Sequence, residues 1–222
     1  AVFTVPAENV EELKSIVAEY AETFAQEYKG IEKSITVTAE DVETPATQIP
    51  QEIQDNVVNA INACHNAVLR YIPSIPDIVE TSSNLAIVNI GGGKASVKIL
   101  ARSASESQKE CIANMLESCF CMAGMKVTLS GDYQGWDPNP DSEMIRVMSG
   151  IYSREFGKEP KVNVVHAGLE CSVILSKYPG LDIVSFGPTL RHPHTPQECC
   201  QISTVDKFWH LLKCTLAEVP EK

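Results

Sequence analysis

A short stretch near the end of the chain combines residues that could bind a metal ion. His192-Pro193-His194-Thr195-Pro196 follows a predicted strand, and α/β proteins place their sites where such strands end. Neutral imidazole is the commonest metal ligand, and the flanking prolines leave the backbone little freedom to lose on binding. Two histidines two residues apart can flank a metal only in an extended backbone. The stretch is therefore a candidate metal site, with a surface loop as the alternative.

A second stretch, His166-Ala-Gly-Leu-Glu-Cys171, leaves a predicted strand and opens a predicted helix. Gly168 would let a ligand approach the backbone, and the free N–H groups of a helix N-terminus attract a carboxylate. Glu170 could receive an ammonium group. An ordinary strand-to-helix turn explains the same residues, and both interpretations stay open. For His65 and His210, which fall in predicted helices, packed or surface roles are expected.

Composition and charge exclude several classes of protein. The 222 residues are 44% hydrophobic and 21% charged, as in soluble globular proteins, and the apolar runs are far too short to cross a membrane. The net charge is -11, and residues 1–56 hold 12 acids and 3 bases, so the chain repels phosphate backbones and no nucleic-acid partner is expected. The 8 cysteines are few for a disulfide framework, which favours reduced thiols in a cytoplasmic protein.

The elements that must position these residues follow from hydrophobic periodicity. The first 131 residues predict a two-layer α/β sandwich with helices over 8–28, 51–72 and 103–123, strands over 35–42 and 125–130, and a hairpin of 84–90 with 94–102. Ser103 and Glu106 form a capping-box pattern for the third helix, and Gly124 closes it.

The hairpin turns at Gly91-Gly92-Gly93. These glycines precede a strand rather than a helix, so they do not form a phosphate loop. Because side chains alternate along a strand, Val97, Ile99 and Ala101 share one face, and Arg102 projects away from the local core.

The composition changes after residue 131, where a Gly- and Pro-rich segment, 131–140, indicates a crossing between domains. Beyond it the pattern predicts helices over 141–156, 167–177 and 203–218, strands over 162–165 and 181–186, and a Pro-rich loop over 187–196. Strands that alternate with helices predict a mostly parallel sheet, but two strands make only part of one. The expected fold class is α/β (α+β), with a sandwich domain over 1–131 and an incomplete α/β domain over 132–222.

Several motifs, in order along nearly the whole chain, resemble those of aminoacyl-histidine dipeptidases, also called cytosol non-specific dipeptidases, of the dinuclear-zinc metallopeptidase superfamily. The matching segments are Glu80–Leu85, Arg102-Ser103, Gly135-Trp136-x-Pro138, His166–Cys171, Ser185–Leu190, Pro193–Pro196 and Phe208-Trp209. The resemblance implies a cytoplasmic, homodimeric hydrolase that cleaves unblocked dipeptides such as Xaa-His with a metal-activated water. It also implies that 1–131 correspond to most of a lid and dimerisation domain, and 132–222 to the C-terminal part of the catalytic domain.

The resemblance assigns roles to individual residues. His194 matches the C-terminal zinc ligand of the family, and Arg102 matches a lid arginine that binds the carboxylate of the substrate. Glu170 and Gly168 match a loop lining the substrate pocket, and Asn84 matches a recurrent lid asparagine. His166 begins the signature and is expected to support the pocket without binding metal.

The resemblance also shows what this sequence lacks. The two Zn²⁺ ions of the full-length family need a His-x-Asp element, a bridging aspartate, another aspartate ligand and a Glu-Glu pair with the general base, all upstream of the matching region. The residues here supply at most one partial zinc site and no catalytic base, so the chain alone is expected to be inactive. Gln197-Glu-Cys-Cys200 departs from the family pattern. The alternatives are a non-catalytic dimerisation or peptide-binding piece and, more remotely, a cysteine-based zinc or redox protein.

Overall fold

The structure is a computed structural model that describes residues 1–75, 77–136, 139, 141–164 and 170–219. The chain divides into two compact units, Ala1–Asp55 and Asn56–Lys222. The predicted boundary near residue 131 falls inside the second unit and stays a prediction. Among the described residues, no helix is both long and apolar enough to cross a bilayer.

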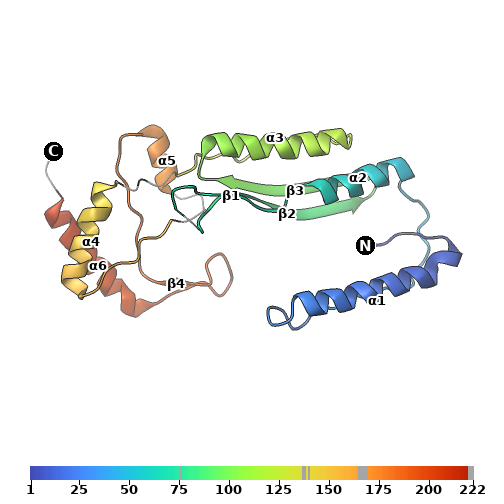
Figure 1. The fold of residues 1–222 in the computed structure, drawn as a ribbon, viewed down its shortest axis with the longest axis horizontal. Coiled ribbons are helices and arrows are strands. Elements are labelled where there is room, and N and C mark those ends of the chain that lie inside the picture. The colour runs from blue at the N-terminus through green and yellow to red at the C-terminus, as the bar shows by residue number, and fades with distance from the viewer. Residues whose placement is uncertain (76, 137–138, 140, 165–169, 220–222) are drawn as a thin grey trace. The chain divides into compact units, whose positions relative to one another are not determined.

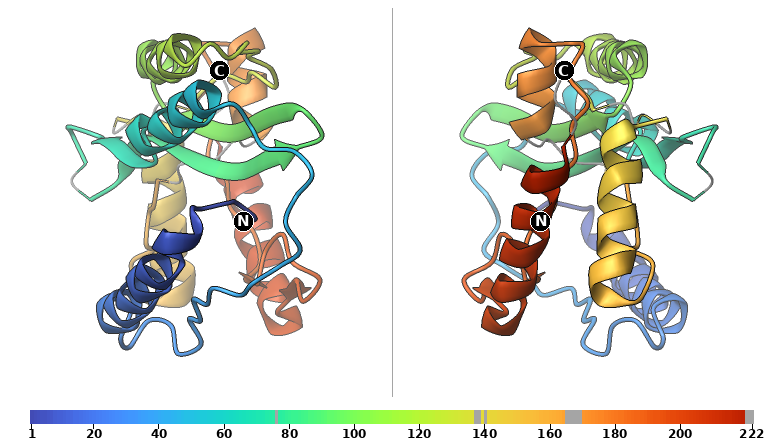
Figure 2. Two further views of the ribbon diagram at one scale, coloured as in Figure 1. Left: turned by 90° about the vertical axis from the view of Figure 1, so that its right-hand side faces the viewer. Right: turned by 90° about the vertical axis from the view of Figure 1, so that its left-hand side faces the viewer.

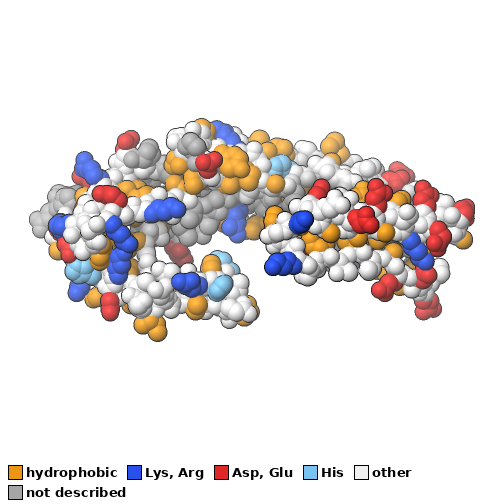
Figure 3. Space-filling model, turned by 60° about the horizontal axis from the view of Figure 1, so that its bottom comes forward, with side chains coloured by type: hydrophobic (Ala, Val, Ile, Leu, Met, Phe, Trp, Pro, Cys, Tyr) orange, Lys and Arg blue, Asp and Glu red, His pale blue; other side chains and the backbone are white. Residues whose placement is uncertain are grey.

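The first unit contains the 3₁₀ turn η1 (Ala7–Asn9) and helix α1 (Val10–Glu27), which confirms the helix predicted over 8–28 (Figure 1). The strand predicted over 35–42 is wrong. Ile35 and Val37 are half-buried and alternate with exposed neighbours, but the segment finds no ladder partner among the described residues. Acidic side chains gather at the right-hand end of the face shown in Figure 3, in keeping with the charge of residues 1–56.

The second unit begins within helix α2 (Gln51–Ala63) and continues with three antiparallel strands in the order β1-β2-β3. These are β1 (Ala67–Tyr71), β2 (Val79–Gly91) and β3 (Lys94–Ser103). The single helix predicted over 51–72 is therefore wrong beyond Ala63. The Asn66 side chain accepts a hydrogen bond from the Leu85 N–H (2.8 Å), which joins the end of the helix to β2. Val68 and Tyr71, which follow, are residue types that favour a strand.

The predicted hairpin is confirmed. Gly91 pairs with Lys94, and the two residues between them, Gly92 and Gly93, both have positive φ (58° and 73°). Such a two-residue turn matches the twist of its strands, and glycine adopts the required backbone at little cost. The predicted alternation also holds, because Val97, Ile99 and Ala101 pack against the core and their neighbours Ser96 and Lys98 are exposed.

Helices α2 and α3 (Glu106–Met122) pack against the sheet through one hydrophobic core. Its buried members are Ala60, Cys64, Ile112, Leu116 and Phe120. Helix α3 begins after Ser105, so the capping box that starts at Ser103 is wrong; the Ser103 hydroxyl instead lies at the buried end of β3. Gly124 ends the helix region with φ 75°, as predicted. Residues 125–130 form no strand, although Met125 and Val127 pack on the same core.

The rest of the second unit is built around α4 (Glu143–Phe156) and α6 (Val205–Glu218), which lie side by side and share a core of Met148, Ile151 and Leu211 (Figures 1 and 2). These helices confirm two predictions, and Gly157 ends α4 with φ 66°. The remaining elements are α5 (Glu170–Lys177), β4 (Leu190–Arg191), β5 (Cys199–Cys200) and η2 (Ile202–Thr204).

The predicted parallel sheet does not form in the part of the chain that the structure describes. Residues 162–164 and 181–186 are not strands, and β4 and β5 pair antiparallel. Parallel strands are normally covered on both faces, whereas Val162 is 57% and Leu181 is 46% exposed. Residue 165, the end of the first predicted strand, lies outside the described residues. The fold is nonetheless of the mixed helix-and-sheet class, as predicted.

Replacing Ile112 by alanine should lower the free energy of unfolding by about 2–5 kcal/mol, because this side chain is fully buried and its removal leaves a cavity. Met122→Ala, on the same helix at an 83% exposed position, should change it by less than about 0.5 kcal/mol. Urea unfolding followed by circular dichroism measures both. Equal effects of the two substitutions would contradict the position of the core.

Candidate functional site

The hairpin brings two of the predicted substrate-binding residues to one face. Across the β2–β3 ladder Asn84 pairs with Leu100 and Ser82 pairs with Arg102. Because side chains alternate, Asn84 and Arg102 share the face opposite the α3 core and are diagonal neighbours, about 7–8 Å apart at their Cα atoms. Asn84 is exposed and Arg102 is half-buried. A guanidinium and an amide on one open face can bind a carboxylate by charge and by hydrogen bonds.

A buried polar network lies at the strand ends that border this face. The Thr81 and Ser103 hydroxyls are 2.8 Å apart, and Ser103 also accepts a hydrogen bond from the Ser105 N–H (3.1 Å). Glu80, which is 7% exposed, pairs with the Arg70 guanidinium at 3.4 Å. Sequence reasoning placed Glu80–Leu85 in a family motif but did not anticipate this buried carboxylate. Because buried polar groups are costly unless partnered, the network fixes the strand end that carries Arg102.

The histidine loop between β4 and β5 differs from the predicted conformation. His192 and His194 both adopt left-handed backbone, with φ 52° and 63°, so the extended arrangement required for two histidines to flank one metal is absent. His194 is exposed, and its backbone N–H donates to the Glu198 carboxylate at 2.7 Å. The Thr195 hydroxyl donates to the His192 carbonyl at 2.8 Å. These bonds stabilise a backbone that non-glycine residues seldom adopt.

The second predicted stretch is only partly described. Glu170 is the first residue of α5 and is exposed. Gly168 and His166 lie outside the described residues, so the expectations for them are untested. The structure therefore brings together Asn84 and Arg102, and it places Glu170 and His194 on separate exposed segments.

A cavity of about 1410 Å³ opens within the second unit, between the start of α3, the segment 181–187 and the α4–α6 pair. At its wall Gly135 approaches the α3 entry so closely that a Cβ atom would lie 2.3 Å from the Ala104 carbonyl oxygen. The Gly135 N–H donates to the Glu106 carboxylate at 2.7 Å. Glycine is thus required in the Gly135-Trp136 motif by steric contact.

Asp182, also at this cavity, caps α4 together with Ser142. The Ser142 hydroxyl donates to Asp182 (2.6 Å) and accepts from the Ile145 N–H (3.1 Å), and the Met144 N–H donates to the other Asp182 oxygen (2.9 Å). Hydrogen bonds from the Met144 N–H and then the Ser142 hydroxyl lower the pKa of Asp182 below its usual range.

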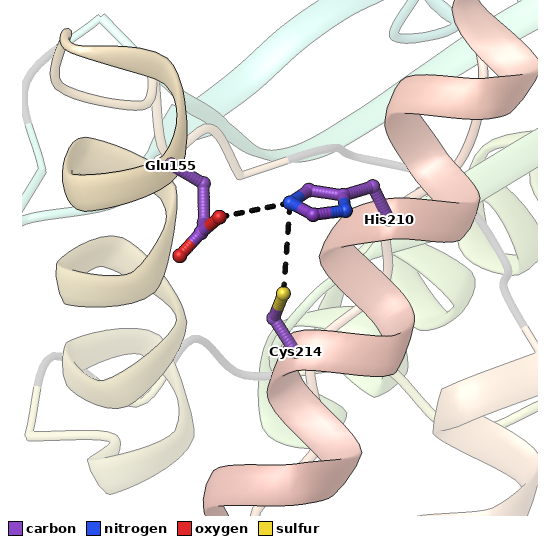
Figure 4. A group of neighbouring side chains, drawn as sticks. All are labelled: Glu155, His210 and Cys214. Atoms are coloured by element: carbon purple, nitrogen blue, oxygen red, sulfur yellow. Dashed lines mark hydrogen bonds and ion pairs between the residues drawn. The ribbon is translucent and has the colours of Figure 1, made fainter.

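Three metal-ligating side chains meet where sequence reasoning expected none. His210 Nε2 lies 2.8 Å from the Glu155 Oε2 atom and 3.7 Å from the Cys214 sulfur (Figure 4). Glu155 lies in the last turn of α4, and the other two lie one turn apart on α6. Hydrogen bonds from His210 and then Arg154 lower the pKa of Glu155. In the sequence only the four-residue spacing of His210 and Cys214 signals this cluster.

The described residues hold a single cluster suited to a metal ion. The Glu155, His210 and Cys214 group is the one set among them with three convergent donor atoms, and it does not include His194. A zinc site needs three or four protein ligands, so His194 alone does not form one. The residues present do not fit the two zinc ions implied by the resemblance.

Two known dipeptidases are similar to this chain along all or nearly all of its length. The chain is 34% identical over all its 222 residues to the cytosol non-specific dipeptidase of Escherichia coli (strain K12), of which it covers 46%. The crystal structure of aminoacylhistidine dipeptidase from Vibrio alginolyticus matches with a TM-score of 0.86 and 37% identity, over 98% of this chain and 44% of that one. The chain thus spans slightly less than half the length of these relatives. No protein-family model matches it.

Asp182→Asn should lower the free energy of unfolding at pH 7 by about 1 kcal/mol, the usual loss for a helix cap. Because the pKa of Asp182 is lowered in the folded state, its contribution is fully present above the ordinary aspartate pKa of about 3.9 and is lost as the pH falls through the lower folded-state value. The difference between wild type and variant should therefore shrink in acid. Urea unfolding at a series of pH values measures it, with Glu110→Gln on α3 as an exposed control. A difference that stays constant with pH would contradict the assignment.

Proposed function

Because the chain is homologous to cytosol non-specific dipeptidase along its whole length, we propose that it is part of a metal-dependent dipeptidase. The relatives are named as dipeptidases, which are hydrolases. Within such an enzyme residues 1–131 would be most of the lid and dimerisation domain, and 132–222 the C-terminal part of the catalytic domain. The proposal includes a dipeptide substrate such as Xaa-His, a homodimer formed through the lid, and a cytoplasmic location.

The observation that carries the proposal is the shared face of Asn84 and Arg102. A free dipeptide ends in a carboxylate, and a positively charged guanidinium at the end of β3 binds that group more strongly than it binds a neutral amide. The buried network of Glu80, Thr81 and Ser103 keeps this strand end in place. Asn84, two ladder positions away, adds an amide that can hydrogen-bond to the peptide.

The other proposed roles belong to the assembled enzyme. His194 would supply one imidazole to the metal centre of the assembled enzyme. Glu170 and Gly168 would line the pocket that receives the dipeptide, with His166 supporting it. The described residues do not complete a two-zinc centre, so no step of hydrolysis is assigned to this chain.

A second candidate function is supported by the same observation. A chain that keeps the Asn84 and Arg102 face but offers one imidazole of the metal centre is suited to peptide binding or dimerisation without catalysis. The two functions differ in turnover. In the whole protein to which these residues belong, binding without hydrolysis supports the second function, and hydrolysis that is lost with a chelator supports the first.

The role of Arg102 can be tested by binding of Gly-His and of its C-terminal amide to the 222-residue chain, measured by calorimetry. A charged hydrogen bond is worth about 1.5–3 kcal/mol, so wild type should prefer the free carboxylate by roughly 10–150-fold. Arg102→Ala should abolish that preference.

Lys98→Ala is the matched control, because Lys98 is an exposed cation on the same strand and the same face. The control should keep the preference. A preference that survives Arg102→Ala, or that disappears equally in the Lys98 variant, would remove Arg102 from the carboxylate site.

The 222-residue chain supplied with Zn²⁺ should not hydrolyse Gly-His, because His194 alone cannot hold the Zn²⁺ ion that would activate the attacking water. Release of free histidine, followed by chromatography with and without a chelator, measures this. Turnover that tracks with the 222-residue chain through purification and stops with the chelator would show that these residues suffice for catalysis.

A further inference from the structure

We propose that Glu155, His210 and Cys214 form a binding site for a single Zn²⁺-like divalent cation between the last turn of α4 and the facing side of α6. The three side chains are one nitrogen, one sulfur and one carboxylate oxygen donor, and these atoms all lie within 4.8 Å of one another. Proteins bind Zn²⁺ with these three types of donor, usually in a site of four ligands.

The convergence on one ring nitrogen is the central observation. His210 Nε2 faces both the Glu155 Oε2 atom and the Cys214 sulfur (Figure 4). A neutral imidazole carries at most one proton at this nitrogen, so a single N–H cannot point well at both acceptors. A metal ion in place of that proton would accept the nitrogen lone pair and bind the oxygen and the sulfur as well.

Two of the three distances between donor atoms can be compared directly with those of a filled site. Tetrahedral zinc with bonds of about 2.0–2.1 Å to nitrogen or oxygen and about 2.3 Å to sulfur separates the nitrogen and sulfur by about 3.5 Å, and the nitrogen and oxygen by about 3.4 Å. The observed nitrogen–sulfur distance is 3.7 Å, and the nitrogen–oxygen distance is 2.8 Å. Binding therefore requires the carboxylate to move outward by roughly half an ångström, which the rotation of an exposed glutamate allows.

The two helices already hold the donors in place. His210 and Cys214 are four residues apart on α6 and so face the same side. The α4–α6 core of Met148, Ile151 and Leu211 fixes the spacing between the helices. Arg154 binds the other oxygen of Glu155 (2.9 Å) and also pairs with Glu218, which leaves Oε2 directed at the histidine.

The cluster is partly open to solvent. The Glu155 and His210 side chains are 25% and 47% exposed, so a cation can enter and a water molecule can take the fourth position. Cys214 binds the metal as the thiolate, and its proton is released to solvent.

Co²⁺ is the direct probe, because it replaces zinc and its absorption reports tetrahedral geometry and thiolate ligation. Titration of the reduced 222-residue chain with Co²⁺ should give visible ligand-field bands and an ultraviolet thiolate-to-cobalt band at one equivalent, and Zn²⁺ should displace both. Cys214→Ser should abolish the ultraviolet band. His210→Ala and Glu155→Gln should each weaken binding by at least about 10-fold, because they remove a direct ligand.

Cys111→Ser and Cys199→Ser are matched controls at exposed cysteines and should leave the spectrum unchanged. Cys214→Ala is a second variant that lacks the sulfur ligand. Urea unfolding without metal checks that each variant is folded. In folded protein Zn²⁺ should raise the unfolding midpoint of wild type and of the controls but not of the Cys214 variants. An ultraviolet band that persists in both Cys214 variants, or that disappears with Cys199→Ser, would overturn the proposal.

Discussion

Burial of one face of the β2–β3 hairpin under α3 determines where the polar side chains of this molecule can act. Val97, Ile99 and Ala101 must face the core that contains the fully buried Ile112. Since strand side chains alternate, the same packing directs Arg102 and its diagonal neighbour Asn84 to the opposite face. A slip of one residue in the register would exchange the two faces. The core thus fixes which face of the hairpin carries the candidate carboxylate site.

The C-terminal part of the second unit is organised differently, because two helices replace a sheet as its centre. The α4–α6 pair buries Met148, Ile151 and Leu211, and Val184, from one of the segments expected to be a parallel strand, packs against this core. Within the part of the chain that the structure describes, 162–164 and 181–186 have no ladder partners. Polar contacts fix the ends of the two helices. Asp182 and Ser142 cap the start of α4, and Arg154 near the end of α4 pairs with Glu218 at the end of α6. The same pairing of helices brings Glu155 together with His210 and Cys214, which lie 55 and 59 residues further along the chain (210 − 155 and 214 − 155).

Sequence patterns predicted those parts of the fold that depend on interactions between residues close in sequence. The hairpin at Gly92-Gly93, the helix stop at Gly124 and the alternation along β3 all depend on neighbours in sequence, and all are confirmed. The end of α2 at Ala63 depends on Asn66 meeting Leu85, a partner 19 residues away, and periodicity did not reveal it. The apolar runs at 162–165 and 181–186 are typical of strands, but a ladder also needs a neighbour. For the candidate site, the family motifs singled out Arg102, Asn84 and His194, whose roles are proposals. The Glu155 cluster could not be predicted in this way, because it depends on how two helices pack.

The left-handed backbone of His192 and His194 has a consequence for recognition. A non-glycine residue in this region costs roughly 1–2 kcal/mol relative to the right-handed form, and the bonds from Thr195 and to Glu198 offset that cost when the chain folds. The free-energy cost of ordering this loop therefore falls on folding and not on ligand binding. A ligand that reaches the His194 imidazole meets a backbone that is already arranged, so association loses less conformational entropy than it would at a flexible loop of the same sequence.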